Sequence, residues 1–303
     1  LHSFPTRRSS DLSAADQRRG RAGRLGPGVC YRLWTAAEHR TLRPHALPEV
    51  LEADLAPLAL ELAVWGAPDP TALRWLDPPP AAAFSQAREL LGRLGALDGA
   101  GAITPHGREM AALGLHPRLA HMLLCAGAMG AGATACLLAA LLDERDILHG
   151  DAGPPDADLR LRLEVLRAAA AGRCPASIAG FAVDRAAVHR ALAQADLLAR
   201  RAGVSPGTTA VDDAGLLLAF AYPDRLARAR AGSPGRFVLR NGRGAALAGP
   251  TPLVAAEWIV AADVDDRGRE SRIFRAAPIA REEIEAHFAG HIRVEQEVAW
   301  DGE

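Results

Sequence analysis

Lysine is absent from this 303-residue chain, so all 35 of its basic residues are arginine. This absence excludes a phosphate-binding loop of the pattern G-x-x-x-x-G-K-[S/T], which requires a lysine. It also means that the high number of arginines is weak evidence of function, because codon bias in a GC-rich genome gives the same composition. Only the position of an arginine within a pattern can therefore indicate a role.

Excess charge is also absent, since 35 basic residues face 36 acidic ones. A strongly cationic nucleic-acid-binding protein is excluded, and any binding face must be local. The four cysteines, Cys30, Cys125, Cys136 and Cys174, form no C-x-x-C pair. Such isolated cysteines favour a reducing cytoplasm and argue against a disulfide framework. No apolar stretch has the length of a membrane span, so we expect no membrane partner.

Aromatic residues are scarce at 5%, whereas hydrophobic residues as a whole reach 49% and Ala and Leu dominate. Ala and Leu are strong helix formers, and this hydrophobic content suffices for buried cores. The composition therefore predicts a mainly α protein.

The first residues fit nothing that follows them. "FPTRRSSDL" can be back-translated into a common sequencing-adapter oligonucleotide. We interpret residues 1–12 as an assembly artefact that packs against nothing, and expect the natural protein to begin upstream.

Residues 44–116 show the order helix, helix, hairpin, helix, which is the outline of a winged-helix domain. Asp54 is a candidate cap for the first helix, and the hairpin is expected at 95–104, with Thr104 capping the helix that follows. The positions expected to face the core are Leu55, Leu58, Leu62 and Trp65 in the first helix, and Phe84, Ala87, Leu91 and Leu94 in the second.

From 117 to 222 the pattern is almost entirely helical and predicts a bundle, with Leu159, Leu163, Leu166 and Ala170 on one helix face. From 223 to 303 the period changes to two. Strands are expected at 236–240, 257–265, 271–278 and 292–301, with a short helix at 281–288 between them. These elements predict an OB-like barrel that lacks its last part, because the chain stops directly after a strand.

Residues 17–24, "QRRGRAGR", match the pattern Q-R-x-G-R-x-G-R at every position, and 27–34 alternates like a short strand. The motif resembles the last conserved helicase motif of the DExH/DEAH class in superfamily 2. Segments 48–66, 75–80 and 95–123 are similar to the regions that follow the motif in DEAH helicases. Segment 219–247 is similar to the HrpB branch of bacterial ATP-dependent RNA helicases.

The resemblance implies that residues 13–43 are the C-terminal tail of a second RecA-like lobe that works with ATP and Mg²⁺. Gln17 would contact the phosphate end of ATP, and Arg21 and Arg24 would act as arginine fingers. Arginine suits this task because its planar fork stays protonated and binds phosphate bidentately. Gly20 and Gly23 would let the backbone turn tightly beside the nucleotide.

The P-loop and the DExH carboxylate motif are both missing from the chain. We therefore expect this chain alone to be inactive, as the accessory part of an ATP-dependent helicase. The alternative is a stand-alone, non-catalytic nucleic-acid-binding adaptor with winged-helix and OB-like modules. A blander interpretation of "QRRGRAGR" is a solvated Arg/Gly tract.

Single-stranded RNA is the second expected partner, bound through its backbone and so without sequence preference. The candidate contacts are Arg225, Arg228, Arg236, Arg240 and Arg243. The alternative is an arginine-rich surface in which Asp224 pairs with Arg228 at helical spacing. Base stacking is expected to add little, because few aromatic residues beyond Phe237 lie nearby.

"HFAGH" places His287 and His291 four residues apart, but Gly290 interrupts the helix and no third ligand is evident. We interpret the two histidines as a surface pair and predict no metal site.

Overall fold

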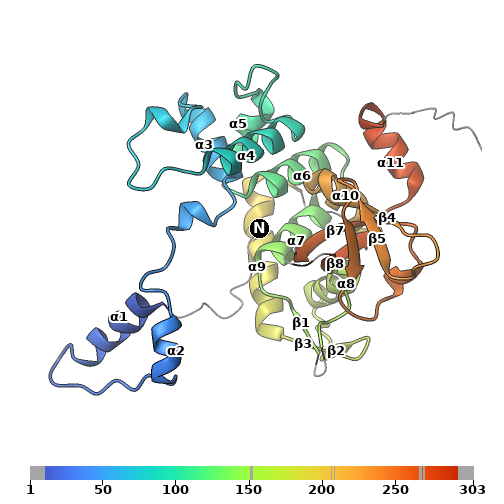
Figure 1. Cartoon of the computed structure of the whole chain (residues 1–303). Helices are drawn as coiled ribbons and strands as arrows, with labels where there is room; N and C mark the ends of the chain where they lie inside the picture. The colour runs from blue at the N-terminus through green and yellow to red at the C-terminus, as the bar shows by residue number, and fades with distance from the viewer. Residues whose placement is uncertain are drawn as a thin grey trace, which may run out of the picture. The chain divides into compact units, whose positions relative to one another are not determined.

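The computed structural model describes residues 11–150, 153–205, 207, 209–265, 268 and 270–292. The chain divides into two compact units, Leu1–Arg108 and Glu109–Glu303 (Figure 1). Each unit is described by itself. No described helix is long and apolar enough to span a membrane.

The first unit is helical. Its elements are α1 (Leu12–Ala22), α2 (Ala36–Thr41), η1 (Glu49–Leu51), α3 (Ala56–Trp65), η2 (Pro70–Ala72), α4 (Ala81–Arg93) and α5 (Pro105–Ala112). Helix α2 begins with a capping box, in which Glu38 N–H donates to the Thr35 hydroxyl and Thr35 N–H donates to the Glu38 carboxylate. Such reciprocal bonds satisfy amide groups that a helix start otherwise leaves without partners.

Residues 11 and 12 contact the rest of the first unit, which corrects the expectation that 1–12 pack against nothing. The Asp11 carboxylate accepts from Ala14 N–H at 2.6 Å and caps α1, and the Leu12 N–H donates to the Arg43 carbonyl at 2.9 Å. An aspartate placed just before a helix caps it whatever its origin. Residues 1–10 lie outside the described residues.

Helices α3 and α4 pack on one another in this unit. All four positions expected inward in α4 and directly after it, Phe84 to Leu94, are buried. Of the four positions expected inward in and before α3, Leu55 and Leu62 are buried, Leu58 is half-buried, and Trp65 is 73% exposed at the end of the helix. The alanines Ala59 and Ala63 and Leu60 contribute to the core as well. The buried stripe of α3 is thus rotated toward its alanines, which allow close packing against α4.

The predicted hairpin at 95–104 is reduced to a single antiparallel bridge between Leu97 and Ile103. The Asp98 side chain closes its turn by accepting from Ala100 and Ala102. The predicted cap is confirmed, since the Thr104 hydroxyl accepts from Gly107 N–H at 2.9 Å.

Residues 27–34 form no strand, contrary to the prediction. Val29, Tyr31 and Leu33 are 74%, 84% and 94% exposed, as expected for a segment without sheet partners. A strand needs a neighbour to accept its backbone hydrogen bonds, and none of the described residues supplies one.

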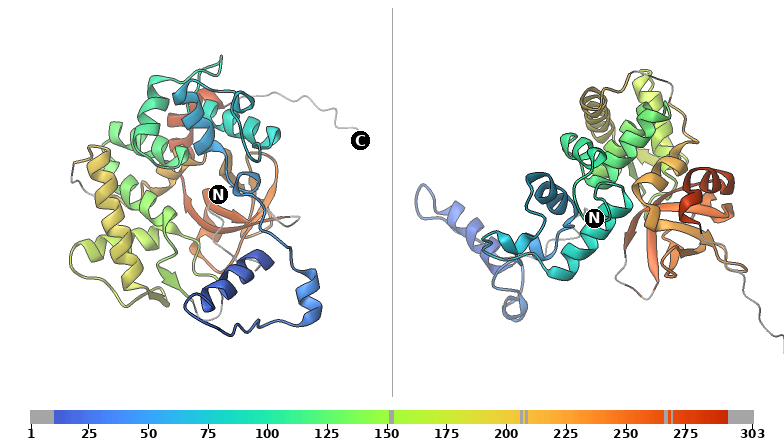
Figure 2. Two further views of the ribbon diagram at one scale, coloured as in Figure 1. Left: turned by 90° about the vertical axis from the view of Figure 1, so that its left-hand side faces the viewer. Right: turned by 90° about the horizontal axis from the view of Figure 1, so that it is seen from above.

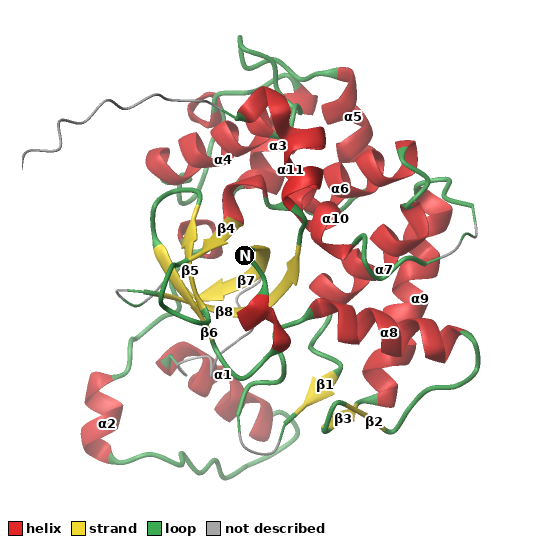
Figure 3. Cartoon of the chain, turned by 90° about the vertical axis from the view of Figure 1, so that its right-hand side faces the viewer, coloured by secondary structure: helices red, strands yellow, loops and turns green. Residues whose placement is uncertain are grey.

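The second unit begins with a helical bundle, as predicted for 117–222. Its helices are α6 (Pro117–Ala128), α7 (Gly132–Asp143), α8 (Leu159–Ala170), α9 (Arg185–Arg201) and α10 (Ala214–Ala221). On α8, Leu159, Leu163 and Leu166 are buried, but Ala170 is exposed in the last turn. A small antiparallel sheet that the pattern did not reveal, β1 (Leu148–His149), β3 (Phe181–Val183) and β2 (Ser177–Ile178), lies at one end of the bundle (Figure 3).

A closed five-stranded barrel follows the bundle (Figures 2 and 3). Its strands are β4 (Leu226–Ala229), β5 (Arg236–Leu239), β6 (Gly244–Leu247), β7 (Trp258–Asp265) and β8 (Ser271–Pro278). They are arranged in the order β4-β5-β6-β8-β7, and β7 pairs again with β4. The β6–β8 pair is parallel and the others are antiparallel. Its core is formed by Phe237, Leu239, Leu253, Ile259 and Ile273, with several small residues.

The expectation of an incomplete barrel with an inserted helix is therefore wrong. Strands β4 and β6, "LARA" and "GAAL", close the barrel. Both were missed because Ala and Gly have low strand propensity. Helix α11 (Arg281–Phe288) follows the last barrel strand, with η5 (Ala289–His291) behind it. The fourth expected strand, 292–301, lies outside the described residues except for Ile292.

Buried arginines join the barrel to the bundle. Arg275 on β8 donates to the Leu141 carbonyl of α7 at 2.9 Å, and its Nε lies 3.1 Å from the Asp263 carboxylate. Arg162 on α8, 1% exposed, donates to the carbonyl of Asp158, and Ala157 in the same loop belongs to the barrel core. Bundle and barrel thus share polar and apolar contacts across their junction.

Candidate nucleotide and nucleic-acid sites

The motif "QRRGRAGR" is mostly helical. Gln17 to Ala22 form the second half of α1, and Gly23 caps its end with φ −97°. The expectation that Gly20 and Gly23 make a tight turn is therefore wrong for Gly20, which lies inside the helix. Arg19 is 66% exposed and pairs with Asp16 at 3.5 Å, so its guanidinium group is solvated.

Arg21 and Arg24 are exposed. Within the described part of the chain, neither guanidinium forms an ion pair or a hydrogen bond. Gln17 and Arg21 lie four residues apart and so on the same face of α1. Two free guanidinium groups beside an amide fit the oxygens of a polyphosphate, which prefer bidentate cationic donors.

The ends of the motif are held by polar contacts. Asp16 accepts from Arg32 at 2.5 Å, and Arg32 also stacks over the Trp34 ring at 5.9 Å. At the start of α1, the hydroxyl of Ser13 and the amide of Ala14 donate to Asp11 and lower the pKa of that carboxyl. These contacts order α1 and leave Arg21 and Arg24 unengaged.

Three of the barrel arginines have exposed side chains. Arg228 on β4 pairs with Glu257 at 3.5 Å, and Arg236 on β5 pairs with Glu270 at 3.0 Å. Arg240, directly after β5, donates to the Pro223 carbonyl at 3.3 Å. Exposed pairs of this kind contribute little stability, so their guanidinium groups can exchange partners easily.

The other two barrel arginines are partly buried. Arg225 donates to the Ala262 carbonyl at 2.7 Å and lies 5.0 Å from the Tyr222 ring centroid. Arg243 donates to the Gly268 carbonyl at 2.7 Å. The turn at Asn241–Gly244 forms, with the Asn241 side chain accepting from Arg243 N–H.

The alternative pairing of Asp224 with Arg228 is wrong, because Asp224 binds Arg118 of α6. The two guanidinium nitrogens of Arg118 donate to both carboxylate oxygens, one at 2.5 Å and one at 2.9 Å. Burial raises the pKa of Asp224, but the hydrogen bonds and charge of Arg118 outweigh it, so the pKa is lowered overall. Asp224 lies in the 3-10 turn η3 (Pro223–Arg225) and Arg228 lies on β4, so the spacing of an α-helix does not apply to them.

Phe237 is 1% exposed inside the barrel, so it cannot stack with a base on the surface. Sequence reasoning missed a different aromatic residue, Trp258, which pairs with Arg228 across β7 and β4. The Arg228 guanidinium lies 5.3 Å from the Trp258 ring centroid. Trp258 is 30 residues beyond Arg228 in the chain, and only closure of the barrel brings the two together.

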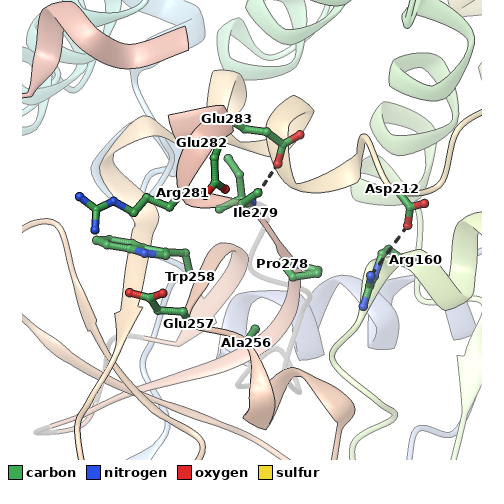
Figure 4. A pocket seen from close by; sticks show the side chains of 11 residues that line it. Arg160, Asp212, Ala256, Glu257, Trp258, Pro278, Ile279, Arg281, Glu282 and Glu283 are labelled. Carbon is green, nitrogen blue, oxygen red and sulfur yellow. Dashed lines mark hydrogen bonds and ion pairs between the residues drawn. The ribbon is translucent and has the colours of Figure 1, made fainter. Parts of the chain in front are cut away.

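Trp258 also lines a pocket between the barrel, α11 and the bundle (Figure 4). The side chains of Trp258 and Glu257 lie on the left of this view, with Arg281 and Glu282 above them. Arg160 and Asp212, 4.0 Å apart, lie on the opposite side of the pocket.

The remaining candidate groups do not assemble a reactive site. Burial raises the pKa of the Cys125 and Cys136 thiols to about 11, so both stay protonated near neutral pH. His287 packs against Phe220, with ring centroids 5.9 Å apart. In the described ranges, no group of three or more His, Cys, Asp or Glu side chains is placed to hold a metal ion.

We compared the chain with known proteins by sequence and by structure. No protein-family model matches the chain. The ATP-dependent RNA helicase HrpB of Escherichia coli is 43% identical over 46% of this chain. The splicing helicase prp22 of Schizosaccharomyces pombe is 37% identical over 44%, and the probable helicase DHX34 of mouse is 38% identical over 37%. The chain covers 17%, 12% and 10% of these relatives, respectively.

Solved structures match over most of this chain. Two crystal structures of E. coli HrpB cover 92% and 90% of it, at 32% identity, with TM-scores of 0.68 and 0.70. The match spans 31% of each solved chain. By sequence and by structure, the chain is therefore related to the HrpB-type ATP-dependent RNA helicases of the DEAH class and corresponds to their C-terminal part.

Proposed function

We propose that this chain is the accessory C-terminal part of an ATP-dependent RNA helicase that couples ATP hydrolysis to translocation along, or unwinding of, nucleic acid. The observation that carries the proposal is the complete "QRRGRAGR" motif, with Arg21 and Arg24 unengaged, in a chain whose structure matches HrpB over 92% of its length. The whole enzyme would work in the cytoplasm.

Residues 13–43 would complete a second RecA-like lobe, and 44–116, 117–222 and 223–303 would be a winged-helix domain, a helical bundle and an OB-like domain. The order β4-β5-β6-β8-β7, with one parallel pair, supports the OB-like assignment. The succession of α3, α4, a β-bridge and α5 supports the winged helix.

Gln17, Arg21 and Arg24 would bind the phosphate end of ATP, which arrives with Mg²⁺. Phosphoryl transfer spreads negative charge over the oxygens of the γ-phosphate. Guanidinium groups stabilise this charge most strongly where they are already fixed in place. In this chain, the caps and ion pairs of α1 would hold Arg21 in place, and Gly23 would bring Arg24 past the helix end.

Single-stranded RNA would bind along the barrel through its phosphates, with Arg228, Arg236 and Arg240 as the exposed contacts. Arg225 and Arg243 would support them, since both bind barrel carbonyls. Backbone contacts of this kind carry no base information, so binding would tolerate most sequences.

Substitution in the longer helicase that carries this segment tests the nucleotide role. We expect Arg21→Ala and Arg24→Ala each to lower RNA-stimulated ATP turnover by about 10³-fold, the magnitude typical of an arginine finger. Arg19→Ala is the matched control and is expected to keep normal turnover, because its exposed pair with Asp16 contributes little, whereas the Asp11 cap and the Arg32–Asp16 pair of α1 remain.

The 303-residue chain by itself should hydrolyse no ATP above background, because it has neither P-loop nor DExH motif. Normal turnover of both finger variants would instead leave the solvated Arg/Gly tract as the interpretation of "QRRGRAGR".

A further inference from the structure

The pocket of Figure 4 contains one aromatic side chain, Trp258, among charged and smaller apolar residues. Trp258 lies at the start of β7, where the antiparallel pairing places it opposite Arg228. Glu257 precedes it in the chain, and Arg281 and Glu282 come from the start of α11. Barrel and helix thus enclose a half-buried indole ring.

The indole N–H of Trp258 has no hydrogen-bond partner in the described part of the chain, although its Nε1 atom is buried. A buried indole N–H without an acceptor costs free energy, and such groups are rare in native structures.

Arg228 covers the ring of Trp258 with a side chain that can leave. Arg228 lies over the indole, but its side chain is 62% exposed, and its ion pair with Glu257 is equally open to solvent. Exposed pairs contribute little stability, so displacing Arg228 costs little. Once displaced, its guanidinium would be free to bind a phosphate beside the pocket.

The pocket is lined by more carboxylates than guanidinium groups, so it disfavours a phosphate. Asp212, Glu257 and Glu282 supply carboxylates that repel anions, and the two arginines, Arg160 and Arg281, are paired with Asp158 and Glu285. Carboxylates accept hydrogen bonds from the exocyclic amino groups of bases, as in the contact of Glu or Asp with the N4 amino group of cytosine. Glu283 is already engaged, since it accepts from Ala280 N–H at 2.8 Å.

We propose that Trp258 and Glu257 form a binding site for one unpaired nucleobase that carries an exocyclic amino group. The base displaces Arg228, stacks on the indole and donates its amino group to Glu257. This inference rests on RNA binding by the barrel, as proposed above, and adds base preference at one position of an otherwise sequence-tolerant strand.

Binding of fluorescent 12-nucleotide RNAs to the 303-residue chain tests the site. The chain should bind oligo(A) and oligo(C) more tightly than oligo(U), because uracil has no amino group. Trp258→Leu should weaken oligo(A) and oligo(C) binding at least about fivefold, the lower end of measured stacking effects, without changing the salt dependence. Trp258→Phe, which retains an aromatic face, should keep most of the affinity.

Glu257→Gln tests the site without destabilising the barrel, because the Glu257 side chain is exposed. The variant should lose the preference over oligo(U) and keep its affinity for oligo(U); Glu89→Gln, in an exposed pair on α4, is the matched control. Unchanged preference in Glu257→Gln, or unchanged affinity in folded Trp258→Leu, overturns this site and leaves backbone binding standing. A chain that binds none of the three RNAs overturns both proposals.

Discussion

At the scale of single residues, burial divides the arginines of this chain into two groups. Arg118, Arg162 and Arg275 are under 10% exposed, and each binds a carboxylate and at least one backbone carbonyl. Arg21 and Arg24 lie on the surface without partners in the described part of the chain. The first group stabilises the fold, because a buried guanidinium must have its donors satisfied. The second group remains available for an anionic ligand.

The Arg118–Asp224 pair predicts acid sensitivity. The pKa of Asp224 is lowered on folding, so the pair contributes stability above the unfolded pKa of about 3.9. That contribution is lost as the pH falls further, through the folded pKa. At pH 7, Asp224→Asn should lower the free energy of unfolding by about 2 kcal/mol, the value of a hydrogen bond to a charged group.

Urea unfolding of the wild type and Asp224→Asn between pH 7 and pH 2 measures this difference, which should shrink below about pH 4. Glu89→Gln removes a carboxylate from an exposed pair and should change stability by less than about 0.5 kcal/mol. A difference between the wild type and Asp224→Asn that is independent of pH would contradict the assigned charge interaction.

At the scale of elements, the close contact of α10 with β8 requires a residue without a side chain, Gly215. A Cβ at Gly215 would lie 1.8 Å from the Pro278 carbonyl oxygen, so helix and strand approach backbone to backbone. Gly215→Ala must push α10 away from the barrel, and we expect a loss of about 1–3 kcal/mol in thermal or urea unfolding, as for other overpacked sites.

Gly127→Ala on α6 is the control for that substitution, because a Cβ there meets nothing within 4 Å. It should be neutral or stabilise by up to about 1 kcal/mol, since alanine favours helix more than glycine does. Equal effects of the two substitutions would show that helix propensity, and not the contact with β8, decides the result.

At the scale of the whole molecule, near-zero net charge means that RNA binding depends on where the arginines lie. Arg236 and Arg240 lie on the exposed side of β5 and directly after it, and we expect both to contact phosphates. Arg236→Ala with Arg240→Ala should weaken binding of every RNA and lower the slope of log K against log salt by about 1.4, or about 0.7 per contact.

Fluorescence anisotropy across a salt series measures this slope. Arg93→Ala with Arg185→Ala removes the same charge from exposed helix positions on α4 and α9, and it should leave the slope unchanged. Equal slopes for the two double variants would place the RNA path elsewhere on the chain.

Local patterns were sufficient for several elements. Helix 281–288 and strand 271–278 agree with α11 and β8 at both ends, and the Thr104 cap formed as predicted. They could be predicted because a period of 3.6 or 2 and a capping hydroxyl act within a few residues. Segment 27–34 failed for the opposite reason, since strand formation depends on a neighbouring strand.

The sequence by itself determined the helical content, the "QRRGRAGR" motif and the resemblance to DEAH helicases, because all three depend on neighbouring residues. Only the tertiary structure decided which arginines are buried, how the barrel closes and where Trp258 lies. Arg118 meets Asp224 across 106 residues, and Arg275 meets the Leu141 carbonyl across 134. Burial depends on such distant pairings, so arginines that look alike in the sequence stabilise the fold in one place and remain free for ligands in another.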